Sequence, residues 1–149
     1  MLQMEKKSRR LNPVIEDRQA QFDLESEKLT AVRKRRIEIV AAMRAKQNEY
    51  MLGVTRLNDE RGTANRLMLE ALETGLDSVK NHWMKLYQGV IEIEAHEKAQ
   101  LELMSKAHRE LEAIKTLQAK YQVEITKEEA RREQKTLDEH SIGKFVRQS

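Results

Sequence analysis

Apolar residues recur at alternating steps of three and four between residues 69 and 125, and this repeat constrains the fold more than any other feature of the sequence. One heptad series has seven apolar residues in nine positions: Leu69, Leu76, Trp83, Val90, Glu97, Met104, Leu111, Gln118 and Ile125. The other has seven in eight: Leu72, Val79, Leu86, Ile93, Gln100, Ala107, Ile114 and Tyr121. A seam of this length indicates a helix that pairs with another helix as a coiled coil.

The first half of the chain carries a less regular form of the same repeat. Its seam positions are Leu11, Ile15, Arg18, Phe22, Glu25, Leu29 and Val32, followed by Val40, Met43, Gln47, Tyr50, Val54 and Leu57. The series slips at Arg36, as a four-residue insertion in the heptad count (a stutter) would make it do. No run of alternating polar and β-branched residues predicts a strand.

The segment NPVIED has the features of a helix start. Asn12 can act as the cap, and Pro13 suits the first helical position because its ring fixes a compatible φ. Glu16 and Asp17 would then face the positive end of the helix dipole. We therefore expect the first helix to begin at Pro13.

A turn is predicted within NDERGTAN, residues 58–65. Gly62 can adopt the left-handed conformation that ends a helix, and Thr63 can cap the next one. The expected organisation is a single coiled-coil domain over residues 1–149. Its parts are a helix over about 13–60, a turn at about 61–63, a helix over about 64–140 and a flexible C-terminal tail.

Folding the chain at Gly62 brings the two seams together in register. In an antiparallel pair the numbers of facing residues add up to a constant, and several seam residues share the value 126. The facing pairs are Leu57 with Leu69, Val54 with Leu72, Tyr50 with Leu76, and Met43 with Trp83. The polar seam residues Glu25 and Gln100 also fall nearly opposite each other. The predicted fold class is therefore all-α, an antiparallel two-helix coiled-coil hairpin.

The same register leaves residues 126–149 without a partner in the chain, since Met1 reaches only Ile125. There the seam turns polar, with Glu128, Arg132, Lys135 and Glu139 at positions that had been apolar. An exposed seam must be polar if the helix is to stay in water. Two interpretations fit this segment: a solvated helix end, or a polar surface that contacts a partner.

The composition argues against several classes of protein. The 28 basic and 25 acidic residues are nearly balanced and aromatics make up only 4%, unlike a nucleic-acid-binding protein. The longest apolar run, IVAAM at 39–43, is too short to insert into a membrane. The opening MLQMEKKSRR lacks the apolar core of a secretory signal, so we expect a protein of the cytoplasm, with peripheral association at a membrane left open.

The residues that usually carry catalysis are absent or badly spaced. There is no cysteine, no glycine-rich phosphate loop, and no pair of histidines four residues apart. The sequence therefore predicts no enzyme, no catalytic residue, no metal site and no cofactor. The basic run RKRR, residues 33–36, is expected to form a solvated helix face.

The segment EEARREQKTLDE resembles the C-terminal signature of the FliJ family, the central-stalk component of the flagellar type III export apparatus. The matching residues are Arg131, Glu133, Gln134, Lys135, Leu137, Asp138 and Glu139. The opening RRLNPVIEDRQ, QNEY at 47–50 and LMLEALETGL at 67–76 resemble other family segments. The resemblance covers nearly the whole chain.

This resemblance implies a stalk that enters the export ATPase hexamer, promotes its assembly and activity, and couples it to the export gate. It also implies that the protein handles export chaperones and works at the inner face of the cell membrane. The residues expected to contact the ATPase ring are Arg9, Arg10, Arg131, Arg132, Lys135, Asp138 and Glu139. Those expected to contact the cytoplasmic part of the gate, beside the turn, are Leu69, Leu72 and Leu76.

Two other functions stay open at this point. One is a self-associating structural or scaffolding coiled coil, which as a parallel dimer would need a continuous helix across Gly62. The other is an injectisome stalk protein of the YscO type, which shares the architecture.

Overall fold

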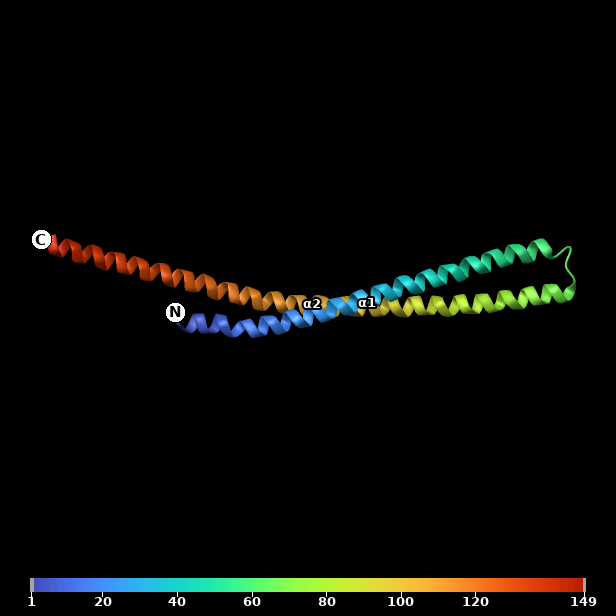
Figure 1. Ribbon diagram of the computed structural model, residues 1–149, viewed down its shortest axis with the longest axis horizontal. Helices are drawn as coiled ribbons and strands as arrows, with labels where there is room; N and C mark the ends of the chain where they lie inside the picture. The colour runs from blue at the N-terminus through green and yellow to red at the C-terminus, as the bar shows by residue number, and fades with distance from the viewer. Residues whose placement is uncertain (1, 149) are drawn as a thin grey trace. The chain divides into compact units, whose positions relative to one another are not determined.

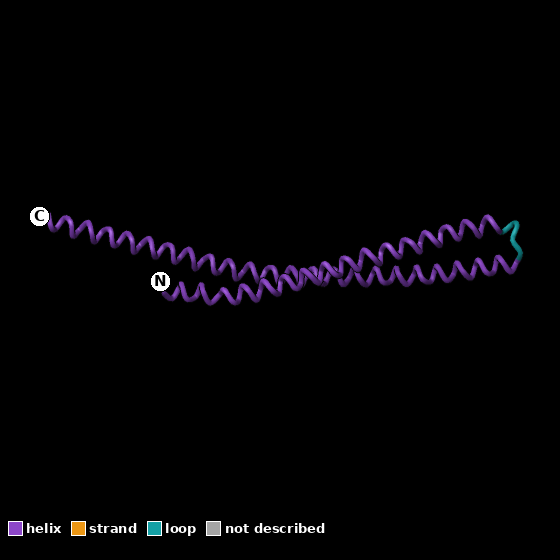
Figure 2. The backbone as a smooth tube through the Cα atoms, in the orientation of Figure 1, coloured by secondary structure: helices purple, strands orange, loops and turns teal. Residues whose placement is uncertain are grey.

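The chain forms two long helices in the computed structural model, which describes residues 2–148 (Figure 1). α1 spans Leu2–Glu60 and α2 spans Arg66–Gln148. The structure is 97% helical, and residues 2–148 include no strand (Figure 2). The two helices pack against each other, which confirms the predicted all-α helical hairpin.

The contacts of the chain divide into two compact units. Unit 1 consists of residues 1–24 and 104–149, and unit 2 of residues 25–103. Within each unit, a stretch of α1 packs on an antiparallel stretch of α2, and unit 2 also holds the turn that joins them. Contacts in such a pair run only across the seam, so each unit has its own core.

The predicted seam is the buried face of both helices. None of the seam positions expected from the heptads is exposed. The buried apolar residues are Leu29, Val32, Leu57 and Val90 in unit 2, and Ala107, Leu111 and Ile125 in unit 1. The heptad pattern thus predicted correctly which face of each helix packs against the other.

The predicted pairing is nearly correct, but several side chains contact a residue further along the partner helix than the one predicted to face them. The rings of Tyr50 and Trp83 lie 5.7 Å apart, although Met43 was expected to face Trp83. Side chains of an α-helix lean toward its N-terminus, so in an antiparallel pair they lean in opposite directions and meet between layers. Phe22 and His108 in unit 1, with centroids 5.2 Å apart, are offset in the same sense. Pairing by Cα level therefore misplaces the longer side chains.

The first helix begins at Leu2 and not at Pro13, which lies inside α1. Asn12 does not cap a helix there. Its side-chain oxygen instead accepts a hydrogen bond from Gln118 Nε2 at 2.6 Å, and the same nitrogen donates to the Ser8 carbonyl at 3.0 Å. Packing across the seam thus holds the helix on both sides of the proline, although the ring removes one backbone hydrogen bond.

The turn occupies residues 61–65 and is capped differently from the prediction. The cap of α2 is Asn65, whose side-chain oxygen accepts a hydrogen bond from the Met68 amide at 2.8 Å, and not Thr63. Among residues 2–148 no glycine has a positive φ, so Gly62 does not use the left-handed conformation. The chain leaves α1 through bonds from the Thr63 and Ala64 amides to the Glu60 carbonyl, which need no left-handed residue.

The C-terminal helix continues to Gln148, past the predicted end near residue 140. No proline follows Pro13 in the sequence, and the one late glycine, Gly143, costs a helix only about 1 kcal/mol relative to alanine. Nothing else in this stretch interrupts the helix. The expected tail is thus helical as far as the structure describes it.

Candidate functional site

The C-terminal part of α2 in unit 1 is a solvated helix rich in charged side chains. Residues 129–147 are exposed, and the last buried residue before them is Ile125. Two contacts of this segment lie within α2: Arg131 pairs with Glu128 at 3.5 Å, and Gln134 donates to Asp138 at 3.0 Å. Arg132, Lys135 and Glu139 are exposed as well, so the charged side chains are available to a partner.

Arg9 and Arg10 lie on the exposed side of α1 in the same unit. Their neighbour Ser8 contacts Gln118 and Gln122, which fixes this part of α1 beside residues near 120 of α2. Arg131 lies about a dozen residues further along α2, or roughly 15 to 20 Å at 1.5 Å per residue. Within residues 2–148 no hydrogen bond or ion pair links these arginines to the charged segment. The structure therefore does not bring the two predicted groups together.

The three leucines expected at the gate lie beside the turn in unit 2, where each is half-buried. Leu76 packs over Gly53, and a Cβ built on that glycine would lie only 2.4 Å from Leu76 Cδ2. Leu76 is therefore held in the seam, while Leu69 and Leu72 occupy seam positions nearer the turn. All three present only part of their surface to a partner.

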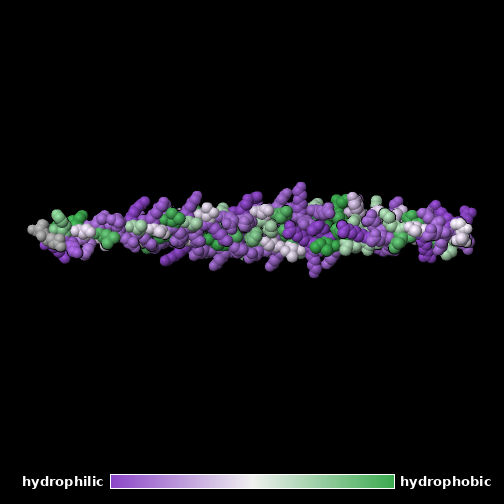
Figure 3. Space-filling view, turned by 90° about the horizontal axis from the view of Figure 1, so that it is seen from above, coloured by the Kyte–Doolittle hydropathy of each residue, from purple (hydrophilic) through white to green (hydrophobic). Residues whose placement is uncertain are grey.

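More exposed apolar side chains lie near the turn, at positions that the heptad analysis passed over. Leu67 is 79% exposed and Leu52 is 72% exposed, and Met51 and Met68 are exposed too. They were missed because they fall outside the repeat used to find the seam. The sequence could have identified them, because a large apolar residue that lies off the seam of a helix pair faces solvent. The space-filling view shows such apolar side chains scattered over a largely hydrophilic surface (Figure 3).

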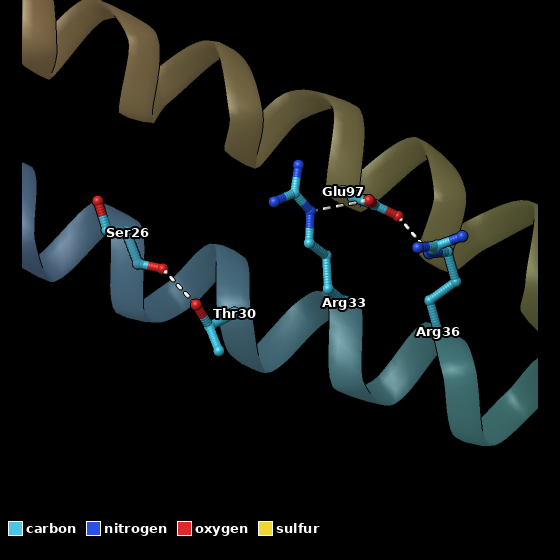
Figure 4. Close-up of polar contacts among 5 residues, drawn as sticks. All are labelled: Ser26, Thr30, Arg33, Arg36 and Glu97. Atoms are coloured by element: carbon cyan, nitrogen blue, oxygen red, sulfur yellow. Dashed lines mark hydrogen bonds and ion pairs between the residues drawn. The ribbon is translucent and has the colours of Figure 1, made fainter.

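The basic run at 33–36 is only in part a solvated face. Arg33 and Arg36 turn to Glu97 of α2, at 3.2 Å and 2.7 Å, and these contacts are drawn in Figure 4. Arg35 pairs with Glu38 on its own helix, and Lys34 is exposed. The spacing of three residues between Arg33 and Arg36 places both on the side of α1 that approaches α2.

The part of the chain that the structure describes offers neither a metal site nor a membrane span. Within residues 2–148, no group of three or more histidine, aspartate or glutamate side chains could hold a metal ion. Neither α1 nor α2, as far as they are described, has a stretch apolar and long enough to span a bilayer.

Comparison with protein families matches residues 6–149 to the family described as Flagellar FliJ protein. The chain belongs to the FliJ family. The match covers nearly the whole chain, so it includes both helices and the charged segment. This FliJ-family chain is a component of the flagellar export apparatus. Comparisons with curated proteins and with solved structures gave no significant match.

Proposed function

We propose that this FliJ-family protein is a non-enzymatic central stalk of flagellar protein export. The C-terminal segment of α2 enters the export ATPase hexamer and promotes its assembly and activity. The turn end of unit 2, which carries Leu69, Leu72 and Leu76, faces the export gate, and the stalk couples the ring to it. The protein acts in the cytoplasm, at the inner face of the cell membrane, and also helps to recycle export chaperones.

The observation that carries this proposal is the exposure of residues 129–147 in a helix rich in charged side chains. A polar ring lining would meet such a helix through many weak contacts, since a single exposed ion pair contributes no more than about 1 kcal/mol. Contacts of this kind can form and break as the ring changes shape. Family membership supports the flagellar setting, and the resemblance of EEARREQKTLDE to the family signature supports the choice of segment.

The proposal is tested by reversing three charges in the segment. The triple variant R131E/R132E/K135E should lose stimulation of the ATPase in a steady-state assay, because it removes several contacts at once. Single substitutions should do little. Stimulation by the parent protein should also fall as salt rises, since exposed charges are screened over about 8 Å near physiological ionic strength.

The matched control reverses three other exposed basic residues of α2, as K80E/K85E/K98E. This control should stimulate the ATPase as the parent does, and circular dichroism should show unchanged helicity for both variants. Full stimulation by the R131E/R132E/K135E variant, at low and high salt alike, would leave the segment as an ordinary solvated helix end. Equal loss in both triple variants would point to net charge and not to this segment.

A further inference from the structure

A layer of polar side chains interrupts the apolar seam of unit 2. We call it the polar layer, and its members are Glu25, Arg33 and Arg36 of α1 and Glu97 and Gln100 of α2. Apolar residues share this stretch of the seam, with Leu29 and Val32 both buried. Glu25 and Gln100 are therefore enclosed in the core of the helix pair, whereas the side chains of Arg33 and Arg36 remain 49% and 37% exposed at its edge.

Glu25 and Gln100 form the buried half of the polar layer. Their exposed fractions are 6% and 5%. Gln100 Nε2 donates to a carboxylate oxygen of Glu25, and it also donates to the Glu25 backbone carbonyl at 3.1 Å. One amide thus contacts both the side chain and the backbone of the facing residue. Such a contact depends closely on how far α1 and α2 are shifted along each other.

Glu97 forms the other half of the polar layer by bridging two arginines one helical turn apart (Figure 4). Its two carboxylate oxygens lie 3.2 Å from Arg33 Nε and 2.7 Å from Arg36 Nε. The Arg33 contact is a hydrogen bond, whereas the N–H of Arg36 points away from the oxygen, so that contact is an ion pair without a directed hydrogen bond. A single carboxylate of α2 thus contacts two arginine side chains of α1.

Stability alone does not account for this arrangement. Charged and amide groups must lose their water to enter a seam, and apolar residues of similar size often stabilise a helix pair more. Polar residues in a coiled-coil seam are best known for selecting one alignment and one partner at a cost in stability. We propose that the polar layer is a register lock, which holds α1 and α2 of unit 2 in one axial alignment and disfavours a parallel pair of two chains.

Shifting the helices by one heptad breaks the register lock while leaving most apolar layers intact. A shift in one direction would set Glu25 opposite Ile93, and a shift in the other would set Gln100 opposite Val32. Each shift separates Gln100 from Glu25 and sets one of them against an apolar side chain, and a buried polar group left unpaired costs about 1 to 3 kcal/mol. Glu25 keeps its contact with Lys28 of the same helix, 3.7 Å away, in any alignment, so the larger cost falls on Gln100. The leucine, valine and isoleucine layers of the seam discriminate weakly, because they repeat at the same spacing.

A parallel pair of two chains in register would also disrupt the polar layer. Glu25 would then face Glu25 of the second chain, and Glu97 would face Glu97. Like charges opposed across a seam disfavour such a pair. The inference thus explains why the chain pairs with itself as a hairpin, and it does not depend on the proposed export function.

The test replaces the buried half of the polar layer by leucine, as E25L/Q100L, and reads the alignment with engineered disulfides. The chain has no cysteine of its own, so each pair reports without interference. I39C/G89C reports the native alignment, since a Cβ on Gly89 would lie 3.7 Å from Ile39 Cγ2. I39C/H82C and I39C/H96C report shifts of one heptad in either direction. Each pair is introduced into the parent and into E25L/Q100L, and oxidised in dilute solution.

In the parent, the native pair should form within one chain and the shifted pairs should not. In E25L/Q100L, the shifted pairs should rise at least tenfold, which corresponds to about 1.4 kcal/mol of lost discrimination. Light scattering should show a mixture of oligomers for the variant, and its melting temperature should not fall. The matched control Q47L also adds a leucine at a half-buried seam position but leaves the polar layer unchanged, so it should keep the native pair alone.

A second variant, R33L/R36L/E97L, removes the other half of the polar layer and should give shifted pairs as well. The proposal is overturned if E25L/Q100L and R33L/R36L/E97L both form only the native disulfide and keep the oligomeric state of the parent. The turn and the apolar layers would then set the alignment without the polar layer. Shifted pairs in Q47L to the same extent would equally overturn it, because any added leucine would suffice.

Discussion

Two glycines in the interior of the helices near the turn have opposite surroundings. A Cβ on Gly53 would lie 2.4 Å from Leu76 Cδ2, whereas a Cβ on Gly75 would meet no atom within 4 Å. Gly53 therefore lets the helices approach closely under Leu76, and Gly75 has no packing role of this kind. A substitution at Gly75 therefore tests only the backbone cost of a helical glycine. A substitution at Gly53 tests that cost together with the packing of Leu76.

We predict that G75A raises the free energy of unfolding by about 1 kcal/mol, the usual gain for glycine to alanine inside a helix. We predict that G53A lowers it by about 1 kcal/mol, because overpacking typically costs 1 to 3 kcal/mol and exceeds the same gain. Urea unfolding followed by circular dichroism measures both. Equal stabilisation by the two substitutions would mean that Leu76 moves aside freely.

At the same scale, the sequence predicted correctly that Glu25 and Gln100 lie opposite each other, but it did not predict the partners of Glu97. The heptads placed Glu97 in the seam, yet gave no reason to link it to Arg33 and Arg36. The basic run was expected to be solvated because a helix spreads four consecutive residues around its circumference. Spacing alone does not show which of them face a carboxylate on another helix.

Among the elements, α1 departs most from its sequence-based prediction because it continues through Pro13. The NPVIED pattern describes how an isolated helix would begin. It contains no information about the contacts that α2 supplies. Gln118 and Gln122 hold the residues just before the proline, and Glu110 pairs with Arg18 after it at 2.7 Å, so the helix has support on both sides. Tertiary contacts of this kind are not visible in a local pattern.

The variant P13A is predicted to stabilise unit 1. Proline inside a helix costs about 3 kcal/mol relative to alanine, and Pro13 is exposed, so its removal leaves no cavity. Thermal unfolding should show a higher midpoint and a modest gain in helicity. The neighbouring variant V14A is the control, since an exposed substitution is expected to change the free energy of unfolding by no more than about 0.5 kcal/mol. An unchanged midpoint in P13A would indicate that Pro13 does not lower the free energy of unfolding of unit 1.

The fold as a whole was predictable because the heptad repeats of the two halves come into register when the chain is folded at Gly62. Both seams, the antiparallel pairing and the solvated C-terminal helix followed from the spacing of apolar residues, and the structure buries the predicted faces. The candidate binding residues were less predictable. The heptads identify residues that the helices use for each other, so the exposed Leu52 and Leu67 were not singled out.

At the scale of the whole molecule, the proposed stalk has two binding ends that belong to different units. The segment proposed to bind the ATPase is in unit 1, and the leucines proposed for the gate are in unit 2. Damage to one end should therefore leave the function of the other intact. The variant L69A/L72A is predicted to weaken binding to the cytoplasmic part of the export gate in a pull-down, while stimulation of the ATPase stays near that of the parent.

The difficulty with this variant is that both leucines are half-buried in the seam, so their loss also weakens unit 2. L57A is the matched control, because Leu57 lies in the same part of the seam but is only 6% exposed and offers almost nothing to a partner. Truncating a buried leucine typically costs 2 to 5 kcal/mol, so L57A should destabilise unit 2 at least as much as L69A/L72A does. If L57A keeps gate binding at a temperature where both variants are folded, the contact belongs to Leu69 and Leu72. If gate binding falls equally in both variants and follows the loss of helicity, the two leucines serve the seam alone and the exposed Leu52 and Leu67 become the residues to test.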